Sequence, residues 1–135
     1  MNAEVAKLLD ESRRREKGQT LFYRALAALA EEDGEVQAAE RLNALLADEQ
    51  HHLARLTARI LESERSPLSH EVPAPSRPSL EGWEEEARER EEDEVAWYRK
   101  ALGKAMDPQT RKLLEEILAS EEHHARELGG KWMSA

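Results

Sequence analysis

Two stretches of this 135-residue chain are near-copies of each other, and a duplicated helical unit leaves few folds open. Glu49 and His52 recur 72 residues later as Glu121 and His124, each pair within a run of helix-forming residues. Leucine and alanine matches count for little in a helical sequence, whereas a repeated Glu-x-x-His is much harder to obtain by chance. The chain is therefore predicted to consist of two related helical halves.

Breaks in the helical pattern divide each half once more. The four predicted helices cover about residues 3–32, 36–64, 79–106 and 108–128. Gly34 suits the left-handed residue that follows a helix. Asp107 is predicted to be the N-cap of the last helix, with Pro108 at its first position, and Gly129-Gly130 to end it.

The two halves are separated by a proline-rich crossover at residues 65–78. Four prolines lie between Ser66 and Pro78, and they remove backbone donors and disfavour helix in the residues before them. Short links make antiparallel neighbours, and one long crossover is typical of a ferritin-like four-helix bundle. We therefore expect an all-α chain, with one ferritin-like domain over residues 1–135 built from two antiparallel hairpins.

Composition excludes several classes of protein. Acidic residues outnumber Lys and Arg by 29 to 20, and the net charge of −9 should repel nucleic acid and anionic membranes. The absence of cysteine excludes disulfides, a thiol nucleophile and Cys-ligated iron–sulfur centres. No apolar run approaches the roughly 20 residues of a membrane span, and the polar N-terminus lacks the apolar region of a signal peptide. A cytoplasmic protein is the expectation.

Each of the four predicted helices has a stripe of apolar residues along one face. Acidic or imidazole side chains interrupt each of these stripes. These inward positions are Glu16, Glu49, His52, Glu91, Glu121 and His124. Burying an unpaired carboxylate costs several kcal/mol, so the acids need a cationic partner. Two divalent metal ions would balance the charge of four carboxylates. Residues at i and i+3 lie on adjacent turns of one helix face, so each Glu-x-x-His can bind one metal.

Each of the other two helices carries a tyrosine seven residues after its inward glutamate. Seven residues is about two helical turns, which places Tyr23 above Glu16 and Tyr98 above Glu91 on the inward face. A phenol in that position can hydrogen-bond and orient a ligand carboxylate.

The chain resembles the ferritin-like di-iron proteins, and rubrerythrins in particular. One Glu from each of two helices and Glu-x-x-His from each of the other two is their ligand pattern. Rubrerythrins have an additional carboxylate three residues after the third-helix ligand, where this chain has Glu94, while the matching first-helix position is Gln19. The rubredoxin module is absent, because it requires cysteines.

The resemblance implies a site for two iron ions, although ligands of this kind also suit manganese or zinc. The implied carboxylate ligands are Glu16, Glu49, Glu91 and Glu121, with Glu49 and Glu121 as bridges. His52 and His124 would bind one metal each, and Glu94 would be a further ligand or a redox-responsive neighbour. His51 and His123 are rival ligands, but Ser120 replaces the acid in the repeat of Asp48-x-x-His51. We therefore expect the two outer histidines to be exposed or to contact a ligand without binding the metal.

The implied activity is reduction of hydrogen peroxide or oxidation of Fe(II), with oxygen as a further substrate. Peroxidase turnover would need an external electron-donor protein, since the chain has no donor of its own. Two alternatives stay open: a ferroxidase or iron-binding and storage protein, and a helical interaction module with a structural metal. A homodimer or larger homo-oligomer is expected, because two long hairpins leave wide helix faces to cover.

Overall fold

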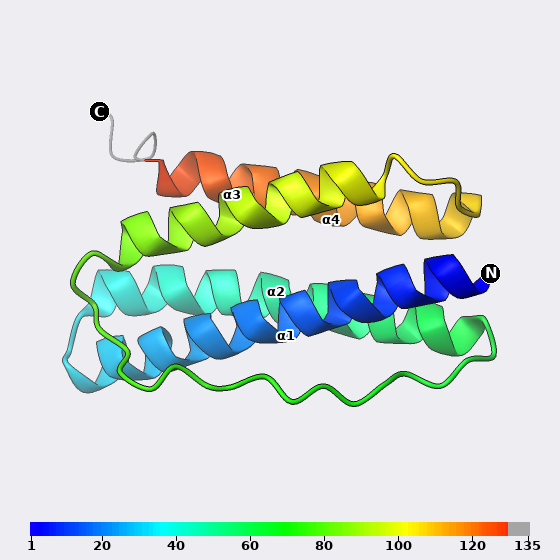
Figure 1. Cartoon of the computed structure of the whole chain (residues 1–135). Helices are drawn as coiled ribbons and strands as arrows, with labels where there is room; N and C mark the ends of the chain where they lie inside the picture. The colour runs from blue at the N-terminus through cyan, green and yellow to red at the C-terminus, as the bar shows by residue number, and fades with distance from the viewer. Residues whose placement is uncertain (130–135) are drawn as a thin grey trace. The chain divides into compact units, whose positions relative to one another are not determined.

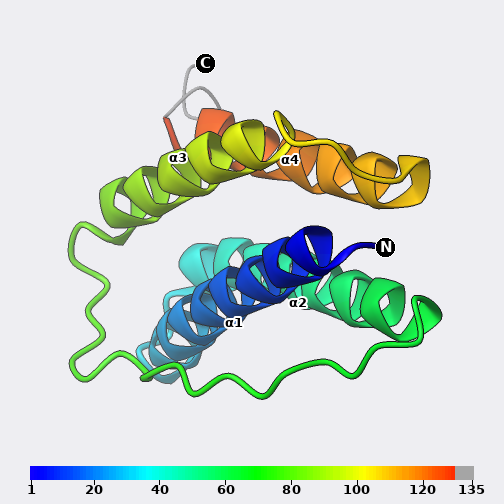
Figure 2. The same ribbon diagram turned by 45° about the vertical axis from the view of Figure 1, so that its right-hand side comes forward.

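The computed structural model describes residues 1–129, which contain four α-helices and no strands (Figure 1). The helices are α1 (Ala3–Glu32), α2 (Val36–Glu62), α3 (Trp83–Ala101) and α4 (Pro108–Leu128). Two compact units are present, one over residues 2–81 and one from residue 82 onward. In each unit two helices lie side by side, α1 with α2 and α3 with α4 (Figures 1 and 2). The prediction of two helical hairpins is confirmed.

The turn between α1 and α2 is built on Gly34, as predicted. Its φ is +72°, which glycine adopts without steric cost. The Glu35 N–H donates to the Ala30 carbonyl at 2.9 Å, and the Gly34 N–H donates to the Glu31 carbonyl at 3.2 Å. This pair of hydrogen bonds is a Schellman motif, which satisfies the last carbonyls of α1.

The helix α2 ends at Glu62, two residues before its predicted end. Glu64 adopts a φ of +62°, and its N–H donates to the Leu61 carbonyl at 3.0 Å. The Arg65 N–H donates to the Ile60 carbonyl at 3.3 Å, which completes a second Schellman motif. Because a glutamate takes the left-handed position that usually holds glycine, the sequence carries no stop signal here.

The predicted bounds of the third helix, 79–106, are too wide. Gly82 is the N-cap of α3 with a φ of +68°, so the helix begins at Trp83. At the other end, the Arg111 guanidinium donates to the Leu102 carbonyl at 3.0 Å and to the Lys104 carbonyl at 2.8 Å. These bonds hold the backbone in a turn after Ala101 instead of a longer helix.

The start of α4 matches its prediction. The Asp107 carboxylate accepts from the Thr110 N–H at 3.0 Å and from the Thr110 hydroxyl at 2.8 Å, and Pro108 is the first helical residue. Gly129 caps the end of α4, whereas Gly130 lies outside the described residues.

The crossover is extended and lies along α1 (Figure 1). The Arg13 guanidinium donates to the Leu68 carbonyl at 2.7 Å and to the Thr57 hydroxyl of α2 at 3.0 Å. Lys17 donates to the His70 carbonyl. Side chains of α1 therefore fix the first part of the crossover through its backbone.

Each hairpin buries a stripe of apolar side chains that a few polar residues interrupt. Leu9, Leu42, Leu56 and Ile60 are buried in the first hairpin, and Leu114, Ile117 and Leu128 in the second. Within residues 1–129, no helix is long and apolar enough to cross a membrane.

Candidate metal-binding site

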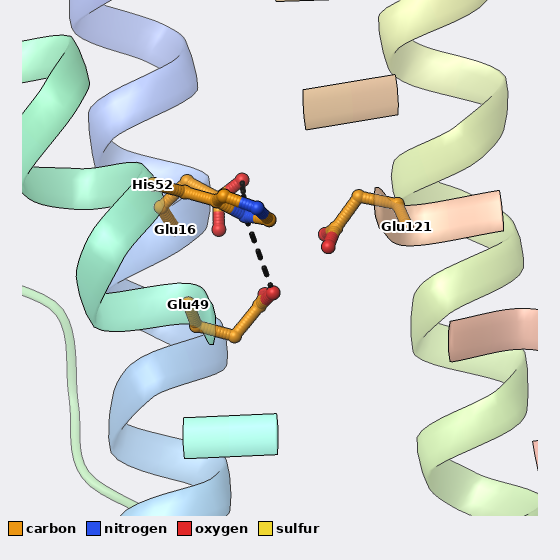
Figure 3. A group of neighbouring side chains, drawn as sticks. All are labelled: Glu16, Glu49, His52 and Glu121. Atoms are coloured by element: carbon orange, nitrogen blue, oxygen red, sulfur yellow. Dashed lines mark ion pairs between the residues drawn. The ribbon is translucent and has the colours of Figure 1, made fainter. Parts of the chain in front are cut away.

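The first hairpin brings one carboxylate of α1 to a carboxylate and an imidazole of α2. Glu16 and Glu49 are fully buried and His52 is 5% exposed. His52 Nδ1 lies 3.5 Å from Glu16 Oε1 and 3.4 Å from Glu49 Oε1 (Figure 3). One ligand atom of each residue lies within 4.8 Å of the other two. We call these three residues the first ligand set.

The second hairpin repeats this arrangement on α3 and α4. Glu91 and Glu121 are fully buried and His124 is 2% exposed. His124 Nδ1 lies 3.5 Å from Glu91 Oε1 and 3.3 Å from Glu121 Oε1. Glu91, Glu121 and His124 form the second ligand set, whose distances agree with those of the first set to within 0.1 Å.

Both sets fit the binding of a metal ion better than a direct hydrogen bond. An N–H···O bond usually spans about 2.7–3.2 Å between its heavy atoms. Donor atoms that each lie about 2.0–2.2 Å from a shared ion are separated by roughly 3.0–3.5 Å. The observed 3.3–3.5 Å falls in the second range. Two carboxylates and one imidazole are ligands that suit iron, manganese and zinc.

Helix geometry and apolar surroundings explain why these side chains meet. The i, i+3 spacing puts Glu49 and His52 on one face of α2, and Glu121 and His124 on one face of α4. Those faces also carry the buried leucines and isoleucines, so the polar groups are buried with them.

In the second ligand set, the two carboxylates change the pKa of the histidine. Burial lowers the pKa of His124, but the neighbouring carboxylates of Glu121 and Glu91 together have the larger, opposite effect and raise that pKa to about 11. In the absence of metal, an imidazolium therefore lies between the two acids at neutral pH. A metal ion must displace this proton before the imidazole can bind it.

Both predicted tyrosines are buried. Tyr23 and Tyr98 have no exposed surface, in agreement with the inward position that their spacing predicts. Tyr23 packs edge-on against Phe22 at a centroid distance of 5.2 Å, and Tyr98 against Trp97 at 4.9 Å. That the phenols orient ligand carboxylates stays a prediction.

Further polar groups are buried on the same helices. Glu94 is 4% exposed and its repeat partner Gln19 is 2% exposed, so both side chains are buried. The role of Glu94 as ligand or neighbour stays a prediction. Sequence reasoning assigns no role to Thr20, which is also buried and whose hydroxyl donates to the Glu16 carbonyl at 2.8 Å. Its position four residues after Glu16, on the inward face, could have indicated this hydrogen bond.

The remaining histidines lie outside the two sets. His51 and His123 are exposed, as expected, and His123 Nε2 lies 3.0 Å from Glu127 Oε1. His70 in the crossover is half-buried, with its side chain 15% exposed and Nε2 4.0 Å from Asp10 Oδ1. The bonds that fix the crossover to α1 account for this burial.

Comparison with solved structures identifies the fold. Bacterioferritin of Rhodobacter capsulatus, described with a metal-free dinuclear site and haem iron, matches with a TM-score of 0.86 and 23% identity, over 96% of this chain and 83% of that one. Desulfovibrio desulfuricans bacterioferritin, described with its di-iron site in different catalytic states, gives 0.85 and 20%, over 95% and 77%. BfrA from M. tuberculosis gives 0.87 and 23%, over 98% and 85%. The chain therefore has the ferritin-like four-helix bundle fold, as predicted.

Sequence comparison identifies the family. No curated protein matches the chain. The rubrerythrin family model matches residues 7–130, which include both ligand sets and all four helices except the first four residues of α1. The resemblance seen in the sequence is thereby confirmed, and the chain belongs to the rubrerythrin family.

Proposed function

We propose that this protein is a ferroxidase that binds and oxidises Fe(II). The observation that carries the proposal is the duplication of a buried Glu–Glu–His set with the same donor spacing in both hairpins. The likeness to bacterioferritins, two of which are described with dinuclear or di-iron sites, supports it. We further propose that the protein binds two iron ions, with one ligand set for each.

The protein residues would act by binding and by charge. Iron supplies the one-electron redox chemistry when it is bound. The carboxylates of Glu16, Glu49, Glu91 and Glu121 compensate its charge and favour the more highly charged Fe(III). His52 and His124 supply nitrogen ligands, and His124 gives up a proton as it does so.

The electron balance favours Fe(II) as the substrate. Two Fe(II) ions supply two electrons, which with two protons convert hydrogen peroxide into two waters, or oxygen into hydrogen peroxide. The chain has no cysteine with which to hold an electron-relay iron centre of the rubredoxin kind. A ferroxidase needs no such relay, because its electrons arrive with the substrate.

The test is stopped-flow oxidation of Fe(II) by oxygen and, separately, by hydrogen peroxide. Wild type is expected to oxidise two Fe(II) per chain quickly. His52→Ala and His124→Ala are expected to lose at least about 100-fold in rate, since each removes a ligand. The adjacent exposed histidines provide matched controls, so His51→Ala and His123→Ala should keep the wild-type rate. Equal rates for the inner and outer variants would rule out the proposed ligands.

Peroxide reduction with an external electron donor is the second candidate, and membership of the rubrerythrin family supports it. Repeated peroxide turnover in the presence of a chemical reductant, without accumulation of Fe(III), would favour this activity. Continued Fe(II) consumption with Fe(III) retained by the protein would favour the ferroxidase. If bound metal stabilised the protein but Fe(II) were not oxidised, the metal site would be structural.

A further inference from the structure

The first part of the crossover is bound along one face of α1. Asp10, Arg13 and Lys17 follow each other at intervals of three and four residues, so they share this face. The Arg13 guanidinium donates to the Leu68 carbonyl at 2.7 Å, and Lys17 donates to the His70 carbonyl. The Leu68 N–H donates in turn to Asp10 Oδ1 at 3.4 Å. These contacts fix the backbone of this part of the crossover.

The imidazole of His70 lies beside Asp10 without a hydrogen bond to it. Its Nε2 is 4.0 Å from Asp10 Oδ1, which is longer than a hydrogen bond. Within the described residues 1–129, Nε2 is buried and has no hydrogen-bond partner. A neutral imidazole carries a proton on only one of its nitrogens, whereas the protonated ring donates from both. Protonation therefore gives Nε2 a proton to donate and places a positive charge beside the carboxylate.

Acids of α1 favour that positive charge on His70. Besides Asp10, Glu11 is within electrostatic reach, because its pKa is lowered first by its hydrogen bond from Arg14 and, to a smaller extent, by His70. Arg14 donates to both carboxylate oxygens of Glu11, at 2.6 and 2.9 Å, so Asp10 is the better partner for the imidazole. Glu71 follows in the crossover, but it is exposed and its charge is screened by water.

Two bases of α1 oppose a charge on the imidazole, but other groups bind them. Arg13 donates to the Thr57 hydroxyl of α2 at 3.0 Å and lies 3.7 Å from Asp10 Oδ1. Lys17 donates to the backbone carbonyl of His70 and not to its ring. The carboxylate beside the ring therefore has the larger effect on its charge.

We propose that His70 is a pH-dependent latch that holds the crossover to α1 when its imidazole is protonated. Imidazoles in proteins commonly gain a proton between pH 5 and 8. The docked crossover places Asp10 beside Nε2, so it binds this proton more tightly than a released crossover does. Protonation must then favour docking by the same factor. A partly exposed ion pair contributes a factor of about two to five.

The first test is an NMR titration of the His70 imidazole in the full chain. Asp10→Asn keeps the shape of the side chain and can still accept from the Leu68 N–H, but it lacks the negative charge. The proton affinity of His70 should fall about two- to fivefold in this variant. Glu11→Gln is the matched control and should have a smaller effect, since Arg14 already binds that carboxylate. Equal proton affinities in wild type and Asp10→Asn would overturn the proposal.

Hydrogen exchange of the Leu68 N–H tests whether the proton also holds the crossover. At pH 5.5, His70→Gln should exchange this hydrogen about two- to fivefold faster than wild type, because the docked crossover protects it. At pH 8 the imidazole is neutral, and the two proteins should exchange at similar rates. His123→Gln changes an exposed histidine of the second hairpin and should have no effect at either pH. A ratio of rates that is the same at both pH values would show that the attachment does not depend on the proton of His70.

Discussion

His124 Nδ1 lies 3.3 Å from Glu121 Oε1, one helical turn earlier on α4. The corresponding atoms of His52 and Glu49 on α2 lie 3.4 Å apart. This spacing exceeds that of an ordinary N–H···O bond and suits two ligands of one ion. Its repetition in both hairpins is the structural basis of the proposed iron chemistry.

Glu121→Ala should abolish one metal position and weaken the other, because Glu121 is a proposed bridging ligand. We expect one Mn(II) or fewer to bind per chain, with an affinity reduced by at least about tenfold. Equilibrium dialysis measures both quantities. Glu115→Ala removes an exposed acid from the same helix and is the matched control. Two ions bound by Glu121→Ala at unchanged affinity would disprove the ligand assignment.

Metal affinity should rise with pH. The pKa of His124 is raised to about 11, so the proton on this residue stabilises the metal-free fold fully below about pH 6.5 and ceases to do so as the pH rises through 11. Between pH 6 and 8 a metal must displace that proton, and the affinity of the second ligand set should increase about tenfold per pH unit. Mn(II) titrations of His52→Ala at pH 6, 7 and 8 isolate this set. A pH-independent affinity would mean that His124 is not a ligand.

Removal of metal should lower the thermal stability of the protein. A ligand at 1,000 times its dissociation constant stabilises the folded state by about 4 kcal/mol. For a chain of this size, that corresponds to a shift in Tm of roughly 10 °C or more. Calorimetry with Mn(II) and with a chelator measures the shift. His51→Ala should retain it, whereas a variant lacking both His52 and His124 should lose it.

Glu94→Ala should still bind two metal ions. The rate at which its bound Fe(II) reacts with hydrogen peroxide should differ from that of wild type. The buried carboxylate lies one turn from Glu91 on the same helix, where it would influence the charge around the second ligand set. Stopped-flow absorbance after a peroxide pulse gives the rate. Glu94→Gln keeps the shape and removes the charge, and should behave like the alanine variant. Wild-type rates in both variants would reduce Glu94 to a packing role.

Glu64→Gly should stabilise the protein by about 0.5–1 kcal/mol. Glu64 has a φ of +62°, which a glycine adopts without the clash between Cβ and the backbone. Urea unfolding measures the free energy. Glu64→Ala is the control, because it removes the side chain but keeps Cβ and should therefore lack the gain. Equal stabilisation by both substitutions would show that the carboxylate is unfavourable here, and not the backbone conformation.

Much of the fold follows from local signals in the sequence. Gly34 and the Asp107-Pro108 pair predict two helix boundaries, because the backbone and capping preferences of these residues are enough to end or begin a helix. The ends of α2 and α3 could not be predicted in this way. Glu64 takes a left-handed conformation that its identity disfavours, and the turn after α3 depends on Arg111, nine residues after Leu102.

The burial of the proposed ligands was predictable, because spacing puts each of them on an apolar helix face. Each Glu-x-x-His falls on an apolar stripe, and the structure places Glu16 beside the first and Glu91 beside the second. The burial of His70 was not predictable, because it depends on contacts between the crossover and α1.

An anaerobic Fe(II) titration that counts the ions bound by each chain tests the proposed iron binding most directly. We predict two ions for wild type, one each for His52→Ala and His124→Ala, and none for the double variant. His51→Ala/His123→Ala should bind two. Absence of stoichiometric binding by wild type, or two ions bound by the double His52/His124 variant, would show that these residues do not form an iron-binding site.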